Sequence, residues 1–170
     1  MQRFLSSPLN SGYKINSALH LLKTAHNAFG DLVAKAYAIT DFLCQDYPKR
    51  FNWYWQKVVP GCFSGTREIL LCTFGEEITG VAILKKEDTE RKICTFLVLE
   101  KYRRKHVSSF LIENAFDFLE TTKPLITIAD YKVDMFKALI QKYHWQKTQT
   151  LGKGYYNNTS REVVFNGTLP

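Results

Sequence analysis

The chain has 170 residues, of which 45% are hydrophobic, 14% aromatic and 23% charged, and its formal net charge is +7. This composition is typical of one globular domain and excludes a disordered or fibrous chain, and no apolar run approaches the roughly 20 residues that a membrane span needs. The positive charge favours anionic partners, such as nucleic acid or a phosphorylated cofactor. The first 16 residues lack the continuous apolar stretch of a signal peptide, so we expect a cytoplasmic protein with no membrane partner.

The four cysteines do not have the spacing of a metal site. Cys44, Cys62, Cys72 and Cys94 include no C-x-x-C pair, and no cluster of cysteine and histidine has the spacing of zinc ligands. We therefore predict no metal, and we expect Cys72 and Cys94 to be buried, reduced thiols because they lie in apolar runs.

The chain is predicted to begin with a helix. Apolar residues recur at helical spacing over residues 15–28, and Asn16 or Ser17 could cap the start. Gly30 is expected to stop this helix, because glycine disfavours the helical conformation.

Two further helical segments are predicted before the strands begin. Residues 32–43 form a less clearly amphipathic helix. A short segment over residues 51–59 is bracketed by Pro48 and by Pro60, and its aromatic cluster, Trp53-Tyr54-Trp55, is expected to pack on the sheet or to bind substrate.

The middle of the chain has the pattern of strands. Residues 68–74 and 78–84 are apolar runs separated by three residues that begin with Gly75, which is hairpin spacing. A charged stretch over residues 85–92 is predicted to form the next turn. Residues 93–99 are apolar on both faces, so we expect a central strand there.

Helices and strands alternate in the last part of the chain. A helix is predicted from Val107, capped by Ser108 or Ser109, and residues 125–129 form another buried strand. Asp134 is expected to cap a helix that runs to about residue 143. The last two strands are predicted over residues 146–151 and 162–165, on either side of a glycine-rich turn.

This order of elements predicts an α/β (α+β) domain with a mixed, mostly antiparallel central sheet flanked by helices. The strand–helix–strand unit over residues 93–129 should be a parallel, right-handed crossover. We find no linker or internal repeat, so residues 1–170 are predicted to form a single domain.

The junction between the central strand and the helix after it has the features of an anion site. The free N–H groups and the dipole at a helix N-terminus favour negative charge, and nearby cations add to this effect. A pyrophosphate is the natural occupant, and a solvated basic turn is the alternative interpretation. At this junction, four of the five residues from 101 to 105 are basic: Lys101, Arg103, Arg104 and Lys105.

This junction resembles motif A of the Gcn5-related N-acetyltransferase (GNAT) family, V-x-P-x-[YF]-[RQ]-x-x-G-x-[GA], which leads into a helix. Here residues 98–108 read VLEKYRRKHVS, and residues 110–113 read FLIE. The context is similar as well, because a Gly-Val-Ala-Ile-Leu strand over residues 80–84 precedes the motif. Residues 143–145, Tyr-His-Trp, stand where the family usually has an aliphatic residue followed by Gly-Phe.

The resemblance covers about residues 50–167, whereas residues 1–45 match the family poorly. It implies acetyl-CoA as co-substrate, an amine-bearing acceptor, and a strand pair that splays apart. In the family the pantetheine arm pairs with the exposed strand edge as an added strand would, which places Phe96, Leu97 and Val98 against it. The pyrophosphate would be held by the loop and helix start: Arg103, Arg104, Lys105, His106, Val107, Ser108 and Ser109.

Three positions depart from the family pattern. Glu100 replaces the usual proline, and His106 and Ser108 replace the two motif glycines. Glycine in such a loop lets the backbone approach a phosphate and adopt positive φ. Either His106 reshapes the loop and donates to a phosphate, or cofactor binding is weakened; we favour retained binding.

The usual catalytic acid of the family is also missing. In many relatives it is a tyrosine, and the matching position here is Ile140. Asp130 is predicted as a candidate base and Tyr131 as a candidate acid, with Tyr155 and Tyr156 as alternatives that could reach the cleft.

Three functions are compatible with these observations. The leading hypothesis is an N-acetyltransferase that transfers an acetyl group from acetyl-CoA to an amine. The second is a non-catalytic acyl-CoA-binding or regulatory domain, which the lost glycines and the absent tyrosine would suggest. The third is a nucleic-acid-binding module that uses the basic run over residues 101–106. We expect a monomer or a homodimer.

Overall fold

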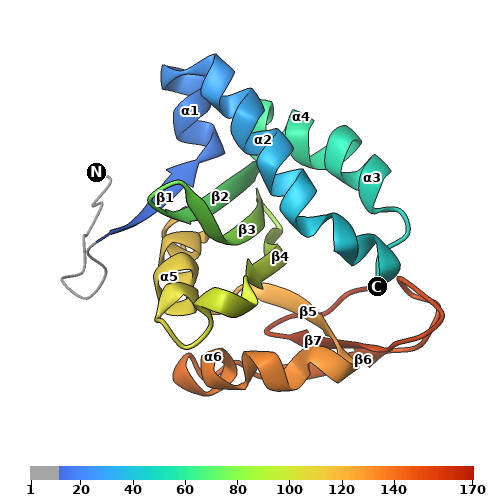
Figure 1. The fold of residues 1–170 in the computed structure, drawn as a ribbon. Helices are drawn as coiled ribbons and strands as arrows, with labels where there is room; N and C mark the ends of the chain where they lie inside the picture. The colour runs from blue at the N-terminus through green and yellow to red at the C-terminus, as the bar shows by residue number, and fades with distance from the viewer. Residues whose placement is uncertain (1–11) are drawn as a thin grey trace.

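The computed structural model describes residues 12–170, which form a seven-stranded sheet with helices on both faces (Figure 1). The strand order is β1-β2-β3-β4-β5-β7-β6, and only the β4–β5 pair is parallel. The mixed, mostly antiparallel sheet and the central position of β4 are therefore confirmed. The strands are β1 (Tyr13–Ser17), β2 (Arg67–Phe74), β3 (Glu77–Glu87), β4 (Glu90–Val98), β5 (Leu125–Ala129), β6 (Lys147–Leu151) and β7 (Glu162–Phe165).

The helices form two layers, one on each face of the sheet (Figure 1). The α-helices are α1 (Ala18–Thr24), α2 (His26–Thr40), α3 (Arg50–Trp53), α4 (Val59–Ser64), α5 (Val107–Leu119) and α6 (Lys137–Lys142). Shorter helical turns are the 3-10 segments η1 (Asp41–Gln45), η3 (Glu100–Tyr102) and η4 (Asp130–Phe136) and the π-helical segment η2 (Tyr54–Val58). Within residues 12–170, no helix combines the length and the hydrophobicity needed to cross a membrane.

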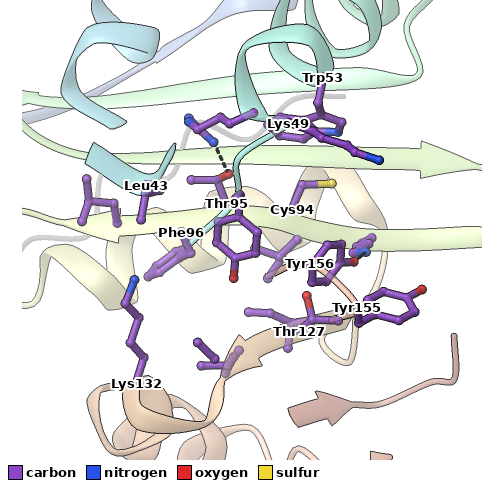
Figure 2. Close-up of a pocket in the computed structure, with 18 of the residues that line it drawn as sticks. Leu43, Lys49, Trp53, Cys94, Thr95, Phe96, Thr127, Lys132, Tyr155 and Tyr156 are labelled. Atoms are coloured by element: carbon purple, nitrogen blue, oxygen red, sulfur yellow. Dashed lines mark hydrogen bonds between the residues drawn. The ribbon is translucent and has the colours of Figure 1, made fainter. Parts of the chain in front are cut away.

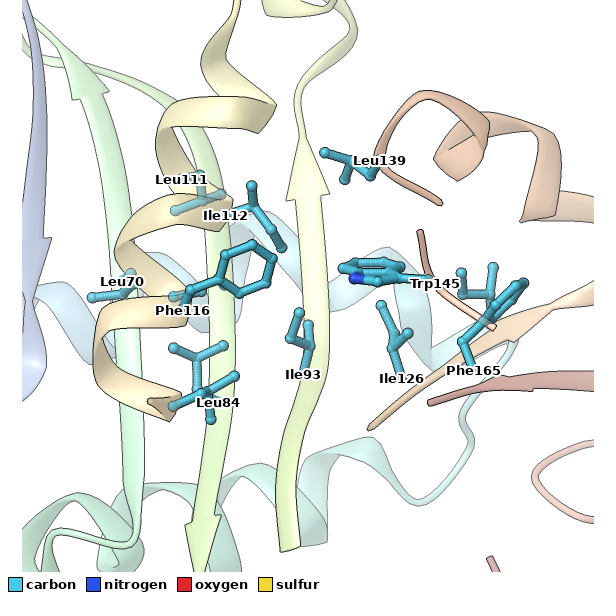
Figure 3. Packing of buried hydrophobic residues seen from close by; sticks show 14 of the residues in the cluster. Leu70, Leu84, Ile93, Leu111, Ile112, Phe116, Ile126, Leu139, Trp145 and Phe165 are labelled. Atoms are coloured by element: carbon cyan, nitrogen blue, oxygen red, sulfur yellow. The ribbon is translucent and has the colours of Figure 1, made fainter. Parts of the chain in front are cut away.

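Alternation along the central strands builds two cores. On β2, Leu70 and Cys72 face α5, whereas Ile69 and Leu71 face the layer of α1 to α4, because successive side chains of a strand point to opposite faces. Figure 3 shows the first core, in which Phe116 of α5 packs over the sheet.

The predicted cap at Ser17 is confirmed, but the bounds of the first predicted helix are wrong. Residues 13–17 form β1, which pairs with β2, and Ser17 caps α1 by accepting the His20 N–H at 3.1 Å. Gly30 does not stop the helix but lies inside α2, and the break falls at Ala25 instead. Phe29 and other buried residues of α2 hold it against the sheet, so tertiary packing overrides the weak propensity of Gly30.

The predicted stop at Pro60 is also wrong, because the helix that starts at Arg50 continues through η2 and α4 to Ser64. Proline has no N–H and its ring clashes with the carbonyl four residues before it, so a regular α-helix cannot pass through it. The wider π-turn before Pro60 accommodates this clash. The turn also buries Tyr54 and Val58 on the same face.

Three further predictions differ from the structure. The charged stretch over residues 85–92 is not a turn along its whole length, because β3 and β4 extend until Glu87 pairs with Glu90. Lys85 forms ion pairs with both of these carboxylates, at 3.1 and 2.9 Å. His106, not a serine, occupies the N-cap position of α5, and it makes no side-chain capping hydrogen bond there. Asp134 lies inside η4 and caps no helix, since α6 begins only at Lys137.

Candidate functional site

The two parallel strands at the centre of the sheet separate soon after they start. β4 and β5 pair at Lys92↔Leu125 and Ile93↔Ile126, and no further pair joins them within the described chain. At the same point the register between β4 and β3 shifts, so that Cys94 is left without a partner. A bulge of this kind bends the strand and increases its twist, which turns β4 away from β5.

The separation opens a cavity of about 790 Å³, which lies within the usual size range of small-molecule sites. Its floor is formed by β4 and β5, and its walls come from α3 and η2 on one side and from η4 and the loop at residues 154–156 on the other. Figure 2 shows Cys94, Thr95 and Phe96 on β4 and Thr127 on β5, on the two sides of the gap, with Tyr155 and Tyr156 at one end.

The polar lining of the cavity is one-sided in charge. Many of the residues that line the cavity are apolar or aromatic. Among the described residues of the lining there is no aspartate or glutamate. Nor does any group of His, Cys, Asp and Glu in residues 12–170 have the arrangement of a metal site. Six basic residues line the cavity: Lys49, Arg50, Lys57, Lys92, Arg103 and Lys132.

The loop between β4 and α5 has positive φ at His106, the position of the first motif glycine, whereas Ser108, at the second, lies inside α5. Arg104 and His106 have φ of 60° and 61°, a region that residues other than glycine rarely adopt. His106 is exposed. The His106 carbonyl accepts the Phe110 N–H at 3.0 Å. The N–H groups of the first three residues of α5 come before this first helical hydrogen bond and have no carbonyl partner within the helix.

The residues predicted to bind a cofactor lie along one path. Phe96, Leu97 and Arg103 line the cavity, and Arg103 Nε also donates to the Val98 carbonyl at 3.4 Å. The rest of the predicted set continues from there around the loop and into α5. Arg104, Lys105 and His106 are exposed, Val107 is buried, and Ser108 and Ser109 are half-buried.

Asp130 and Tyr131, the predicted base and acid, lie next to the cavity, but neither is among the residues that line it. The Tyr131 hydroxyl donates to both carboxylate oxygens of Asp46, at 2.6 and 2.7 Å, and Lys132 binds the same carboxylate. Burial alone would raise the pKa of Asp46, but the hydrogen bonds from Lys132 and Tyr131 lower it below its ordinary value. Asp130 accepts the Tyr131 main-chain N–H. This cluster ties the segment after η1 to η4.

A buried carboxyl group behind the cavity was not predicted from the sequence. Glu162 of β7 is only 1% exposed. One of its oxygens accepts the hydroxyl of Tyr47, a cavity-lining residue, at 3.2 Å, while Oε2 has no partner among the described residues. Burial raises the pKa of Glu162 to about 7. The sequence placed Glu162 in a buried strand, but no local pattern connects it with a tyrosine 115 residues away.

Two comparisons with known sequences found no match: no protein-family model matches the chain, and no curated protein matches it significantly. Solved structures do match. A protein from Desulfovibrio desulfuricans assigned to the GNAT acetyltransferases superposes with a TM-score of 0.61 at 11% identity, over 90% of this chain and 96% of that one.

Two other matches cover somewhat more than half of the chain. One is a protein from Bacillus anthracis assigned as a streptothricin acetyltransferase and solved with acetyl coenzyme A, with a TM-score of 0.51 at 19% identity, over 59% of this chain and only 61% of that one. Ard1 from Thermoplasma volcanium matches with a TM-score of 0.50 at 19% identity, over 57% of this chain and 67% of its own. These likenesses show that the chain has the GNAT fold.

The raised pKa of Glu162 predicts how stability depends on pH. Its ordinary value is 4.5 and its value in the folded protein is about 7, so between these values the folded state binds a proton that the unfolded state has released. Stability therefore falls as pH rises through this window, by up to roughly 3 kcal/mol. Glu162→Gln, which cannot ionise, should remove this loss and be the more stable protein at pH 8.

Urea unfolding of the wild type and of Glu162→Gln at pH 5 and pH 8 would measure the effect. Glu76→Gln, at an exposed position, controls for the general loss of one negative charge. If the free energies of unfolding of wild type and Glu162→Gln change equally between the two pH values, Glu162 is not a buried acid.

The backbone at His106 generates a second prediction. Because φ is positive there, a side chain strains the backbone and glycine relieves that strain by about 1 kcal/mol. His106→Gly should therefore unfold at a higher urea concentration than His106→Ala, although both lose the imidazole. Equal stability of the two variants would show that this residue is not left-handed in solution.

Proposed function

We propose that the chain is an N-acetyltransferase that uses acetyl-CoA and acetylates an amine in the cavity between β4 and β5. The observation that carries the proposal is the separation of these strands after Ile93, which leaves a strand edge open beside a cavity of about 790 Å³. Support comes also from the GNAT fold and from the acetyl coenzyme A bound to the streptothricin acetyltransferase-like neighbour.

The described residues fit such a ligand. An extended arm can pair with the free edge of β4 from Cys94 to Val98, as an added strand would. At the end of β4, the left-handed residues Arg104 and His106 shape a loop that leads into α5. The unbonded N–H groups at that helix start and the arginines around it favour a diphosphate.

When bound, acetyl-CoA supplies an acetyl group activated as a thioester. We assign to the free main-chain N–H groups of β4 the task of donating to the carbonyl oxygen, where negative charge develops during attack by the amine. The attack forms a C–N bond and breaks the C–S bond, so one proton must leave the amine and one must reach the sulfur.

For the proton that leaves the amine, we propose a path through the Tyr47 hydroxyl to the Glu162 carboxylate. Tyr47 lines the cavity and donates to Glu162, and a base with a pKa near 7 is suited to this transfer. For the proton that reaches the sulfur, Tyr156 is the best placed donor, since it lines the cavity and lies 3.5 Å from Lys92 Nζ. Asp130 and Tyr131 stay predictions.

Calorimetric titration with CoA tests the proposal. We expect the wild type to bind CoA and the double variant Arg103→Glu/Arg104→Glu to bind it at least about tenfold more weakly, because charge-assisted hydrogen bonds to the phosphates are lost. The matched control is Lys14→Glu/Lys23→Glu, which makes the same charge change on β1 and α1 and should bind CoA like the wild type.

Thiol release from acetyl-CoA with a panel of amines then separates an enzyme from a binding domain. We expect amine-dependent release by the wild type. Absence of CoA binding at millimolar concentration would refute the proposal, and binding without release by any amine would leave only a CoA-binding domain.

A further inference from the structure

The positive charges around the cavity are only partly neutralised by the protein. Of the six basic residues in its lining, Lys132 is paired with Asp46, and Arg103 donates to a main-chain carbonyl. The other four have no carboxylate partner within residues 12–170. They are Lys49, Arg50, Lys57 and Lys92.

Arg50 differs from the other three because it is buried, with an exposed fraction of 4%. It begins α3, and its guanidinium donates to the hydroxyls of Thr40 and Thr95, the latter at 3.5 Å. The ring of Trp53 lies 5.6 Å from the guanidinium carbon and that of Tyr54 5.9 Å. Figure 2 shows Lys49, Trp53 and Thr95 in this corner of the cavity.

A buried guanidinium that forms no ion pair within residues 12–170 is an unusual arrangement. The nearby carboxylate of Asp41 favours its charged form but does not contact it as an ion pair. Removal of a charge from water is costly unless an opposite charge or several hydrogen bonds compensate for it. Here two hydroxyls and two aromatic rings provide partial compensation, and Nε has no partner among the described residues. Burial lowers the pKa of Arg50, but an arginine remains charged in a protein. The missing counter-charge is one that an anionic ligand in the cavity can provide.

This charge lies apart from the proposed phosphate site. Arg50 belongs to the layer of α1 to α4, which covers one face of the sheet, whereas α5 and its N-terminal loop belong to the layer on the opposite face. Along β4, Arg50 contacts Thr95, but Arg103 reaches Val98 at the end of the strand. The diphosphate of a cofactor at α5 would therefore leave Arg50 unpaired.

We propose that the acceptor carries, in the same molecule as its amine, a carboxylate or phosphate group that pairs with Arg50. Lys49, Lys57 and Lys92 raise the local concentration of such anions in the cavity. The amine half of this proposal rests on the proposed acetyltransferase function, whereas the anion site does not. An acceptor of this class is an amino acid or an aminoalkyl phosphate, and a polyamine would be repelled.

Acetylation rates test the acceptor class. With acetyl-CoA saturating, kcat/KM would be compared for β-alanine and its methyl ester, and for phosphoethanolamine and ethanolamine. We expect at least one anionic amine to be preferred over its neutral partner by about tenfold or more, and the two pairs distinguish carboxylate from phosphate. The preference should fall in Arg50→Met and persist in Lys35→Met, a control at an exposed position of α2.

A second measurement does not depend on catalysis. The melting temperature would be followed with malonate or inorganic phosphate, in the presence of saturating CoA. We expect one of these anions to raise the melting temperature of the wild type and to have a much smaller effect on Arg50→Met. Because Arg50→Met removes a buried charge that no ion pair compensates, it should fold. If it does not, Arg50→Lys, which keeps the charge but loses the planar fork, replaces it in both measurements.

The outcomes separate this inference from the proposed function. Transfer to neutral and anionic amines at equal rates, together with no Arg50-dependent protection by either anion, would overturn the inference and leave the acetyltransferase intact. Protection that depends on Arg50 in a protein that binds no CoA would support the anion site and refute the acetyltransferase.

Discussion

The structure depends on one constraint, which is that β4 and β5 stay apart after two paired residues. β4 is held on its other side by eight pairs with β3, and β5 is held by four pairs with β7, so each strand is fixed although the gap between them is open. The bulge at Cys94 turns β4 away at the point where pairing with β5 stops. Main-chain groups at such an edge need partners, and this need makes the gap suited to an extended ligand.

The charges around the gap follow from what lies on each face of the sheet. On one face, α5 and its loop contribute N–H groups and arginines at the end of β4. On the other face, α3 contributes Arg50 and the aromatic ring of Trp53. The buried acid Glu162 lies outside the lining and is hydrogen-bonded to the lining residue Tyr47. The cavity therefore combines uncompensated positive charge with a protonatable group behind it.

Much of the sheet could be predicted from the sequence, because strands buried on both faces appear as apolar runs with clear ends. β5 and β7 have the predicted bounds, residues 125–129 and 162–165. Gly30 and Pro60 misled the prediction because their local preferences are overcome by packing and by a π-turn. Arg50 could not be recognised as a cavity residue, since Thr95 of β4, which it contacts there, lies 45 residues away in the sequence.

A crystal structure of the protein with acetyl-CoA tests the central claim most directly. The account predicts that the pantetheine arm lies between β4 and β5 and hydrogen-bonds to the main chain of β4 between Cys94 and Val98. Strands that are hydrogen-bonded to each other throughout this stretch, or a cofactor bound at another surface, would contradict it.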